Sequence, residues 1–271
     1  MIDANPCILL LDEGVVYDRK VSSLISFLQD STAFGREVFC LYLSSKRYDL
    51  LDSQPPSLGG RIKVLKRMLV NPVDPAGNRS SLKEALLSFF ATVGPRSGVR
   101  LGVWICAMSP TLYQYPLEAF YWVLYLVGYD IAFVRRLLLS EDEAYEVPHT
   151  LSFSARFANE KVRELLLMAL AYLSVFNSGR IHSIAKKIEE AIPGRYGDSD
   201  TIRKALKPAL EDAYTYSLVE KRTPRIKSVE FSLTRFGRVV TDAVLDRDIL
   251  DHLPNDEVRG FVNRIAEEVR R

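Results

Sequence analysis

The sequence is poor in the side chains that metal sites and nucleophilic enzymes depend on. It contains three cysteines and three histidines among 271 residues. Cys7, Cys40 and Cys106 each lie in an apolar run, and none has a neighbour at zinc-ligand spacing. They therefore predict buried, reduced thiols, as in an intracellular, cytoplasmic protein.

The chain also lacks the glycine-rich phosphate motifs GxGxxG and GxxxxGK[ST], which excludes a standard dinucleotide site or P-loop. A large charge of one sign is missing too, because the net charge is +2. Residues 1–150 hold 15 Lys/Arg against 16 Asp/Glu, and the remainder holds 21 against 18. Any basic surface therefore belongs to the second half. The apolar window 116–134 includes Glu118 and Asp130, which favours a buried helix and strand over a membrane span.

The first half alternates apolar runs with segments of helical spacing. This alternation predicts an α/β, Rossmann-like domain with a mainly parallel sheet and helices on both faces. We expect Ser80 or Ser81 to cap one of its helices. The predicted strands are 7–11, 37–43, 61–70, 99–107 and 130–137, and the predicted helices are 21–28, 80–93 and 116–127.

Two predicted loops are candidates for a ligand site, because ligands of such sheets bind beyond the carboxyl ends of the strands. The loop 12–18 follows the first strand, and the loop 108–115 precedes a helix whose N-terminus favours an anion. Ordinary turn and capping roles are the alternative for these polar residues. The candidates are Asp12, Glu13 and Gly14 in the first loop and Ser109, Thr111 and Gln114 in the second.

The second half predicts helices at 158–177, 180–191 and 200–214, then strands from 217 and at 227–233, then a helix to 245. Pro208 is expected to kink or shorten the third helix. This order is that of a winged helix-turn-helix domain. The segments SLVEK and VEFSLTRFGRVV resemble the wing of archaeal and bacterial regulators, in which a Leu-Val-Glu strand is followed by a Leu-Thr-x-x-Gly turn.

In such a domain the third helix lies in the major groove of DNA and the wing touches the backbone. A wing used for protein contacts is the alternative. The candidate DNA-binding residues are basic and are Lys187, Arg195, Arg203, Lys204, Lys207, Lys221, Arg222, Arg225 and Lys227.

Most of the chain resembles the CARF family, specifically the CRISPR-associated transcriptional regulators of archaea, in its architecture. The segment VWICAMSPTLYQYPLEAFYWVLYLVGYDIAFVRRL has the same succession of strand, polar loop, helix and strand. The family's Thr-Gly-Gly loop is replaced here by Met108-Ser109-Pro110-Thr111. The resemblance implies a homodimer that binds double-stranded DNA, with the two loops binding a cyclic oligoadenylate effector such as cyclic tetra-adenylate. The expected domains are 1–150 (ligand sensing), 156–246 (winged helix) and 247–271 (helical extension).

An enzymatic alternative rests on Arg247 and His252. Their Arg-x4-His spacing is similar to the catalytic motif of HEPN ribonucleases, which are often fused to CARF domains. Only 19 residues follow His252, however, which is too few for a HEPN helical bundle. The segment 256–271 shows helical spacing and is expected to pack either between protomers or on its own domain.

Overall fold

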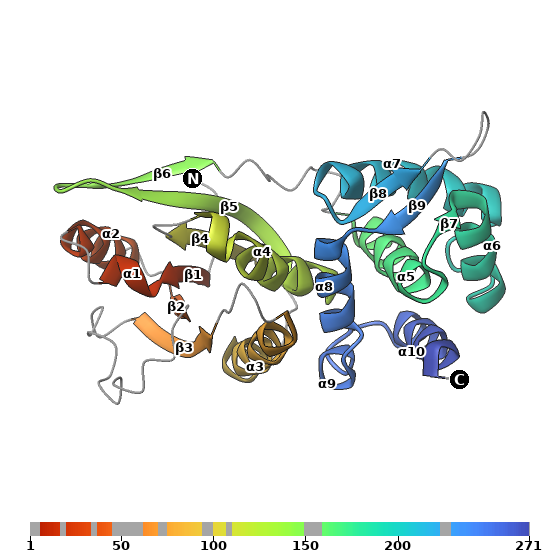
Figure 1. The fold of residues 1–271 in the computed structure, drawn as a ribbon, viewed down its shortest axis with the longest axis horizontal. Helices are drawn as coiled ribbons and strands as arrows, with labels where there is room; N and C mark the ends of the chain where they lie inside the picture. Colours follow the sequence, from red (N-terminus) through yellow and green to blue (C-terminus); the bar gives the residue numbers. More distant parts are fainter. Residues whose placement is uncertain are drawn as a thin grey trace. The chain divides into compact units, whose positions relative to one another are not determined.

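The computed structural model describes residues 6–16, 20–33, 37–44, 62–69, 75–93, 100–106, 110–148, 159–222 and 229–270 (Figure 1). The chain forms two compact units. One comprises Met1–Tyr121 with Tyr129–Ser152, and the other comprises Trp122–Gly128 with Phe153–Arg271. Within the described ranges, every helix is too short or too polar to cross a lipid bilayer.

The first unit is built on a six-stranded sheet with the strand order β3-β2-β1-β4-β5-β6. The first five strands in this order are parallel, and β6 pairs with β5 in the antiparallel sense. The predicted α/β class and mainly parallel sheet are therefore confirmed. The strands are β1 (Cys7–Asp12), β2 (Val38–Ser44), β3 (Ile62–Leu69), β4 (Arg100–Cys106), β5 (Asp130–Leu139) and β6 (Ala144–Pro148).

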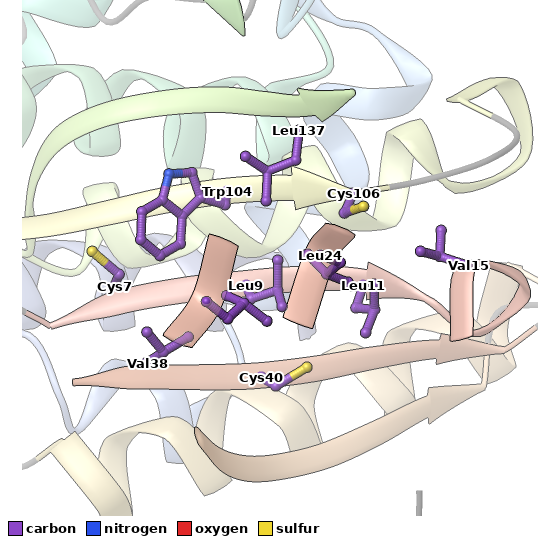
Figure 2. Packing of buried hydrophobic residues seen from close by; sticks show 11 residues of the cluster. Cys7, Leu9, Leu11, Val15, Leu24, Val38, Cys40, Trp104, Cys106 and Leu137 are labelled. Carbon is purple, nitrogen blue, oxygen red and sulfur yellow. The ribbon is translucent and has the colours of Figure 1, made fainter. Parts of the chain in front are cut away.

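Alternate residues of the strands point to opposite faces of this sheet. One face meets Val15 of α1 (Glu13–Val16) and Leu24 and Leu28 of α2 (Val21–Ala33). Figure 2 shows this cluster, in which strand side chains from four neighbouring strands pack together. Ile8 and Leu10 on the other face are also fully buried. Helix α3 (Pro75–Val93) packs against β3, and α4 (Pro110–Leu126) belongs to this unit up to Tyr121.

Two helices of this unit begin earlier in the sequence than predicted. Helix α3 begins at Pro75, so Ser80 lies inside it and Ser80 and Ser81 do not cap it. Helix α4 begins at Pro110, so Thr111 and Gln114 are helical and do not belong to a loop. Proline is favoured at the first helical position because its fixed φ suits the helix and its missing N–H costs nothing there.

The segment after β1 also differs from the predicted loop. Asp12 ends the strand, and Glu13 and Gly14 lie in the short helix α1. The Asp12 carboxylate accepts a hydrogen bond of 2.9 Å from the Gly14 backbone N–H, as an N-cap residue does. Residues 17–19 of that loop lie outside the described part of the chain.

The second unit consists of helices around a three-stranded antiparallel sheet of order β7-β9-β8. The predicted succession of three helices, two strands and a helix is confirmed. Strand β7 has only two residues and was missed because it lies directly before α6, so that Arg180 was assigned to the predicted helix 180–191. The elements are α5 (Glu160–Phe176), β7 (Gly179–Arg180), α6 (Ile181–Ala191), α7 (Ser199–Thr215), β8 (Val219–Arg222), β9 (Glu230–Leu233), α8 (Arg235–Val244), α9 (Arg247–Leu250) and α10 (Asp256–Arg270).

Helix α5 forms the centre of this unit and contacts α6, α7, α8 and α10. The C-terminal helix α10 buries Val258, Phe261, Val262 and Ile265, and it packs on α5 of its own unit. Segment 256–271 thus packs on its own domain, which is one of the two places predicted for it. Helix α7 continues through Pro208 to Thr215, so the expected shortening is wrong. Burial of Ala209, Leu210 and Ala213 beyond the proline offsets the hydrogen bond that it removes.

The Leu-Thr-x-x-Gly segment joins β9 to α8 through two contacts. Thr234 caps α8, because its Oγ1 accepts a hydrogen bond of 2.9 Å from the Gly237 backbone N–H. Gly237 lies against the backbone of Leu218, where a Cβ atom would stand 1.8 Å from the carbonyl oxygen. Since only glycine fits this approach, the motif fixes the start of β8 against α8.

Candidate nucleic-acid interface

Helix α7 presents an exposed stripe that begins in its first turn. Asp200, Arg203, Lys204 and Lys207 are all exposed, and they recur at the three- and four-residue spacing that defines one helix face. The opposite face packs into the core and consists of Ile202, Leu206, Ala209, Leu210 and Ala213. The stripe therefore holds three of the predicted DNA-binding residues on one surface.

The turn before α7 fixes where the stripe starts. Gly194 and Gly197 have φ angles of +79° and +94°, which other residues rarely adopt. Asp198 then caps α7 and accepts a hydrogen bond of 2.8 Å from the Thr201 backbone N–H. Hydrogen bonds from Thr201 hold the pKa of the Asp198 carboxyl below its ordinary value. The cap is therefore charged at neutral pH, which favours the positive end of the helix dipole.

The charge of the exposed stripe changes sign along α7. Its first half contains Arg203, Lys204 and Lys207 together with Asp200, whereas Glu211 and Asp212 follow in its second half. Lys221 of β8 forms an ion pair with Glu211 and lies 4.4 Å from the ring centroid of the exposed Tyr214. Lys221 of β8 thus offsets the charge of Glu211. The basic residues Arg203, Lys204 and Lys207 remain exposed in the other half of the helix.

Strand β8 adds one strongly exposed cation. The Arg222 side chain is 68% exposed and forms an ion pair of 2.7 Å with Glu220. Glu220 also accepts a hydrogen bond of 2.9 Å from the Ser232 hydroxyl of β9. The bonds from Ser232 and Arg222 lower the pKa of Glu220. The predicted residues Arg225 and Lys227 lie outside the described residues.

Arg195, a predicted DNA-binding residue, takes part in a cluster of ion pairs and hydrogen bonds of the second unit, with its side chain 40% exposed. Its guanidinium forms ion pairs of 2.7 Å with Glu257 of α10 and 3.6 Å with Glu164 of α5. The buried Glu164 carboxylate also accepts a 2.6 Å hydrogen bond from the Tyr196 hydroxyl and another from Asn255. This cluster links the α6–α7 turn to α5 and α10, so Arg195 has a structural role in the second unit.

Lys187 is engaged in a similar way. Its Nζ lies 3.3 Å from the Glu268 carboxylate, so it links α6 to α10. The two helices border an open hollow of about 270 Å³ whose apolar residues include Phe261 and Ile265. Lys187 therefore belongs to a different group of contacts from the α7 stripe.

The two candidate ligand loops lie after neighbouring strands. In the sheet register Leu11 of β1 pairs with Cys106, the last residue of β4. Successive strands run from β1 to one sheet edge through β2 and β3, and the chain then returns to β4 on the other side of β1. The carboxyl ends of β1 and β4 therefore flank the point where the strand order reverses, which is the ligand position in open α/β sheets.

The residues described at this point are mostly buried. Asp12 is 4% exposed, and its carboxylate caps α1 as described above. Burial, aided by the negative charge of Asp12, raises the pKa of the Cys106 thiol to about 12. Ser109 lies outside the described residues, and the side chains of Glu13, Thr111 and Gln114 are likewise not described.

The ribonuclease candidates occupy the short segment between α8 and α10. Arg247 is exposed at the start of α9, and the partly buried His252 follows in a turn, where its backbone N–H donates to the Ile249 carbonyl at 3.0 Å. Ile249 and Leu250 anchor the segment in the core. Among the described residues, no group of three His, Cys, Asp or Glu side chains is arranged to hold a metal ion.

Three acidic residues of the interface were missed by sequence reasoning. Asp200, Glu211 and Glu220 each pair with a basic residue that was predicted to bind DNA. The i, i+3 spacing of Asp200 and Arg203 was the available signal for one of these pairs. Comparison with family models, curated proteins and solved structures finds no match for the chain.

Proposed function

We propose that the second unit is a winged helix-turn-helix domain and that the chain is a homodimeric transcriptional regulator that binds double-stranded DNA. The observation that carries this proposal is the exposed basic stripe of Arg203, Lys204 and Lys207 at the start of α7. The order α5, β7, α6, α7, β8, β9, α8 supports it, because α6 and α7 pack together ahead of a two-stranded wing.

In this proposal α7 enters the major groove with its N-terminal half leading. The first residues of a recognition helix contact base edges, and flanking cations contact phosphates. Lys204 and Lys207 are compact exposed charges suited to phosphate. Arg222, with Arg225 and Lys227 beyond it, places the wing against the DNA backbone. Arg195 and Lys187 are left out because their ion pairs reach to separate helices of the unit, whereas Arg203 and Arg222 pair within their own elements.

We further propose that the first unit is a Rossmann-like sensor of the CARF type. The reversal of strand order between β1 and β4 supports a ligand site there. A cyclic oligoadenylate offers phosphates, which suit the N-terminus of α4, and ribose hydroxyls, which are able to donate to a carboxylate. Because a carboxylate repels phosphate, Glu13 is assigned to the hydroxyl side of such a ligand, and the buried Asp12 supports the site by capping α1.

The test is fluorescence anisotropy with labelled duplex DNA from the gene's own promoter region. Replacing Arg203 and Lys204 together by Ala should weaken binding at least tenfold, which corresponds to about 1.4 kcal/mol. The matched control replaces Lys83 and Arg100 of the first unit by Ala, which removes the same charge from the other unit of the chain. Equal losses in both variants, or none in either, would reject the assignment of α7.

A further inference from the structure

Asp200 and Arg203 form an ion pair on the exposed stripe of α7. The distance between Arg203 Nη2 and Asp200 Oδ1 is 3.2 Å, and the two side chains are 49% and 65% exposed. Exposed pairs at this spacing add only a few tenths of a kcal/mol to helix stability. The pair does, however, restrict the directions in which the guanidinium can point.

The place of the pair on the helix determines what it meets in a DNA groove. Asp200 is in the first turn of α7, which the Asp198 cap fixes, and Arg203 is one turn further along. This is the end of a recognition helix that contacts base edges. Lys204 and Lys207 lie beside the pair on the same face, where they have no planar group for reading a base.

The chemistry of the pair favours one base. A guanidinium makes two parallel hydrogen bonds to N7 and O6 of guanine, which is the commonest specific contact in the major groove. A carboxylate that already holds one edge of the guanidinium lowers the entropy lost when the other edge docks. The same carboxylate repels phosphates and so weakens binding to unrelated sequences.

We infer that Asp200 and Arg203 form one base-reading unit, in which Asp200 positions the Arg203 guanidinium against a guanine. The inference rests on the proposed DNA-binding function. Arg203 is the contact residue in this unit, and Asp200 is a positioning residue. The prediction is therefore a preference for guanine at one position of each half-site.

The experiment selects binding sites for the full chain from a pool of random duplexes. Each guanine of the selected site is then replaced by adenine in turn, and affinities are measured by anisotropy at fixed salt. Wild-type protein should lose about 5- to 160-fold in affinity at one position of each half-site. Arg203→Ala should bind the two duplexes equally at that position.

Asp200→Asn separates positioning from a merely structural role. It should discriminate less between guanine and adenine at that position and bind random duplex more tightly, because a charge that repels phosphate is gone. A structural ion pair would leave the preference unchanged. Lys207→Ala is the control, and it should weaken all duplexes by the same factor and reduce the salt slope by about 1.

These measurements test the base-reading unit and the DNA-binding function separately. If Arg203→Ala keeps the guanine preference, Arg203 does not read that base. If Asp200→Asn keeps the full preference, Asp200 does not position Arg203. If wild-type protein binds no duplex even at low salt, the DNA-binding function itself is rejected and the base-reading unit with it.

Discussion

At the scale of single residues, Gly237 is the position where the packing of α8 against Leu218 leaves no room for a side chain. A Cβ atom there would overlap the backbone carbonyl of Leu218. We expect Gly237→Ala to lower the free energy of unfolding by about 1–3 kcal/mol or more, because neither backbone segment yields easily. Urea unfolding followed by circular dichroism measures this change.

Gly260 of α10 is the matched control for that substitution. A Cβ atom at Gly260 meets nothing within 4 Å, and the residue lies inside a helix. Gly260→Ala should therefore raise the free energy of unfolding by about 0.5–1 kcal/mol. Similar losses in both variants would contradict the packing described for Gly237.

The Tyr196 hydroxyl makes a second prediction at the residue scale. It donates to the buried Glu164 carboxylate at 2.6 Å, and the Tyr196 side chain is itself buried. Tyr196→Phe should cost about 1.5–3 kcal/mol of unfolding free energy, the usual worth of a hydrogen bond to a charged group. Tyr214→Phe, on the exposed stripe, should stay within about 0.5 kcal/mol of wild type. Equal effects of the two variants would refute a structural role for the Glu164 cluster.

At the scale of elements, strands were easiest to predict from the sequence where both faces of the sheet are covered. The runs that became β1, β2 and β4 were predicted because both of their faces are covered, which leaves nearly continuous apolar sequence. Strand β6 escaped prediction because it lies at the sheet edge, where Tyr145 is 52% exposed. The early starts of α3 and α4 were missed because Ser80 or Ser81 was taken as the cap of one helix and residues 108–115 as a polar loop before the other.

The candidate site was predictable in part, for a related reason. Arg203, Lys204 and Lys207 follow from helical spacing, which sequence shows directly. The ion pairs of Arg195 could not be predicted, because its partners Glu164 and Glu257 lie far along the chain. Such long-range pairing leaves no local pattern, so a basic residue in a turn looks the same whether it binds phosphate or a distant carboxylate.

The buried Cys106 thiol at the end of β4 predicts how the stability of the first unit depends on pH. Cys106 ends β4 and is 2% exposed, and its thiol stays protonated in the folded chain up to about pH 12. In the unfolded chain it ionises near its ordinary pKa of 9.0. Because the folded pKa is the higher one, stability should fall as pH rises through the interval between the two values. Cys106→Ala should show a smaller fall in unfolding free energy between about pH 8.5 and pH 10.5; an unchanged fall would contradict the burial of this thiol.

At the scale of the whole molecule, the proposal joins a sensor unit to a DNA-binding unit. If cyclic tetra-adenylate alters the affinity for DNA by some factor, DNA must alter the affinity for the nucleotide by the same factor. Isothermal titration of the nucleotide with and without saturating DNA measures this coupling. Binding of both ligands with no mutual effect would reject the regulatory link and leave the two binding functions intact.

The most direct test of the central claim is the salt dependence of duplex binding by wild-type protein and by the Arg203→Ala/Lys204→Ala variant. The logarithm of affinity should fall linearly with the logarithm of salt concentration, by about 0.9 for each phosphate contact. The account predicts a steep wild-type slope that becomes shallower by about 1–2 in the variant. Identical slopes for the two proteins, or no binding by wild-type protein at low salt, would contradict the assignment of α7 as the DNA-binding helix.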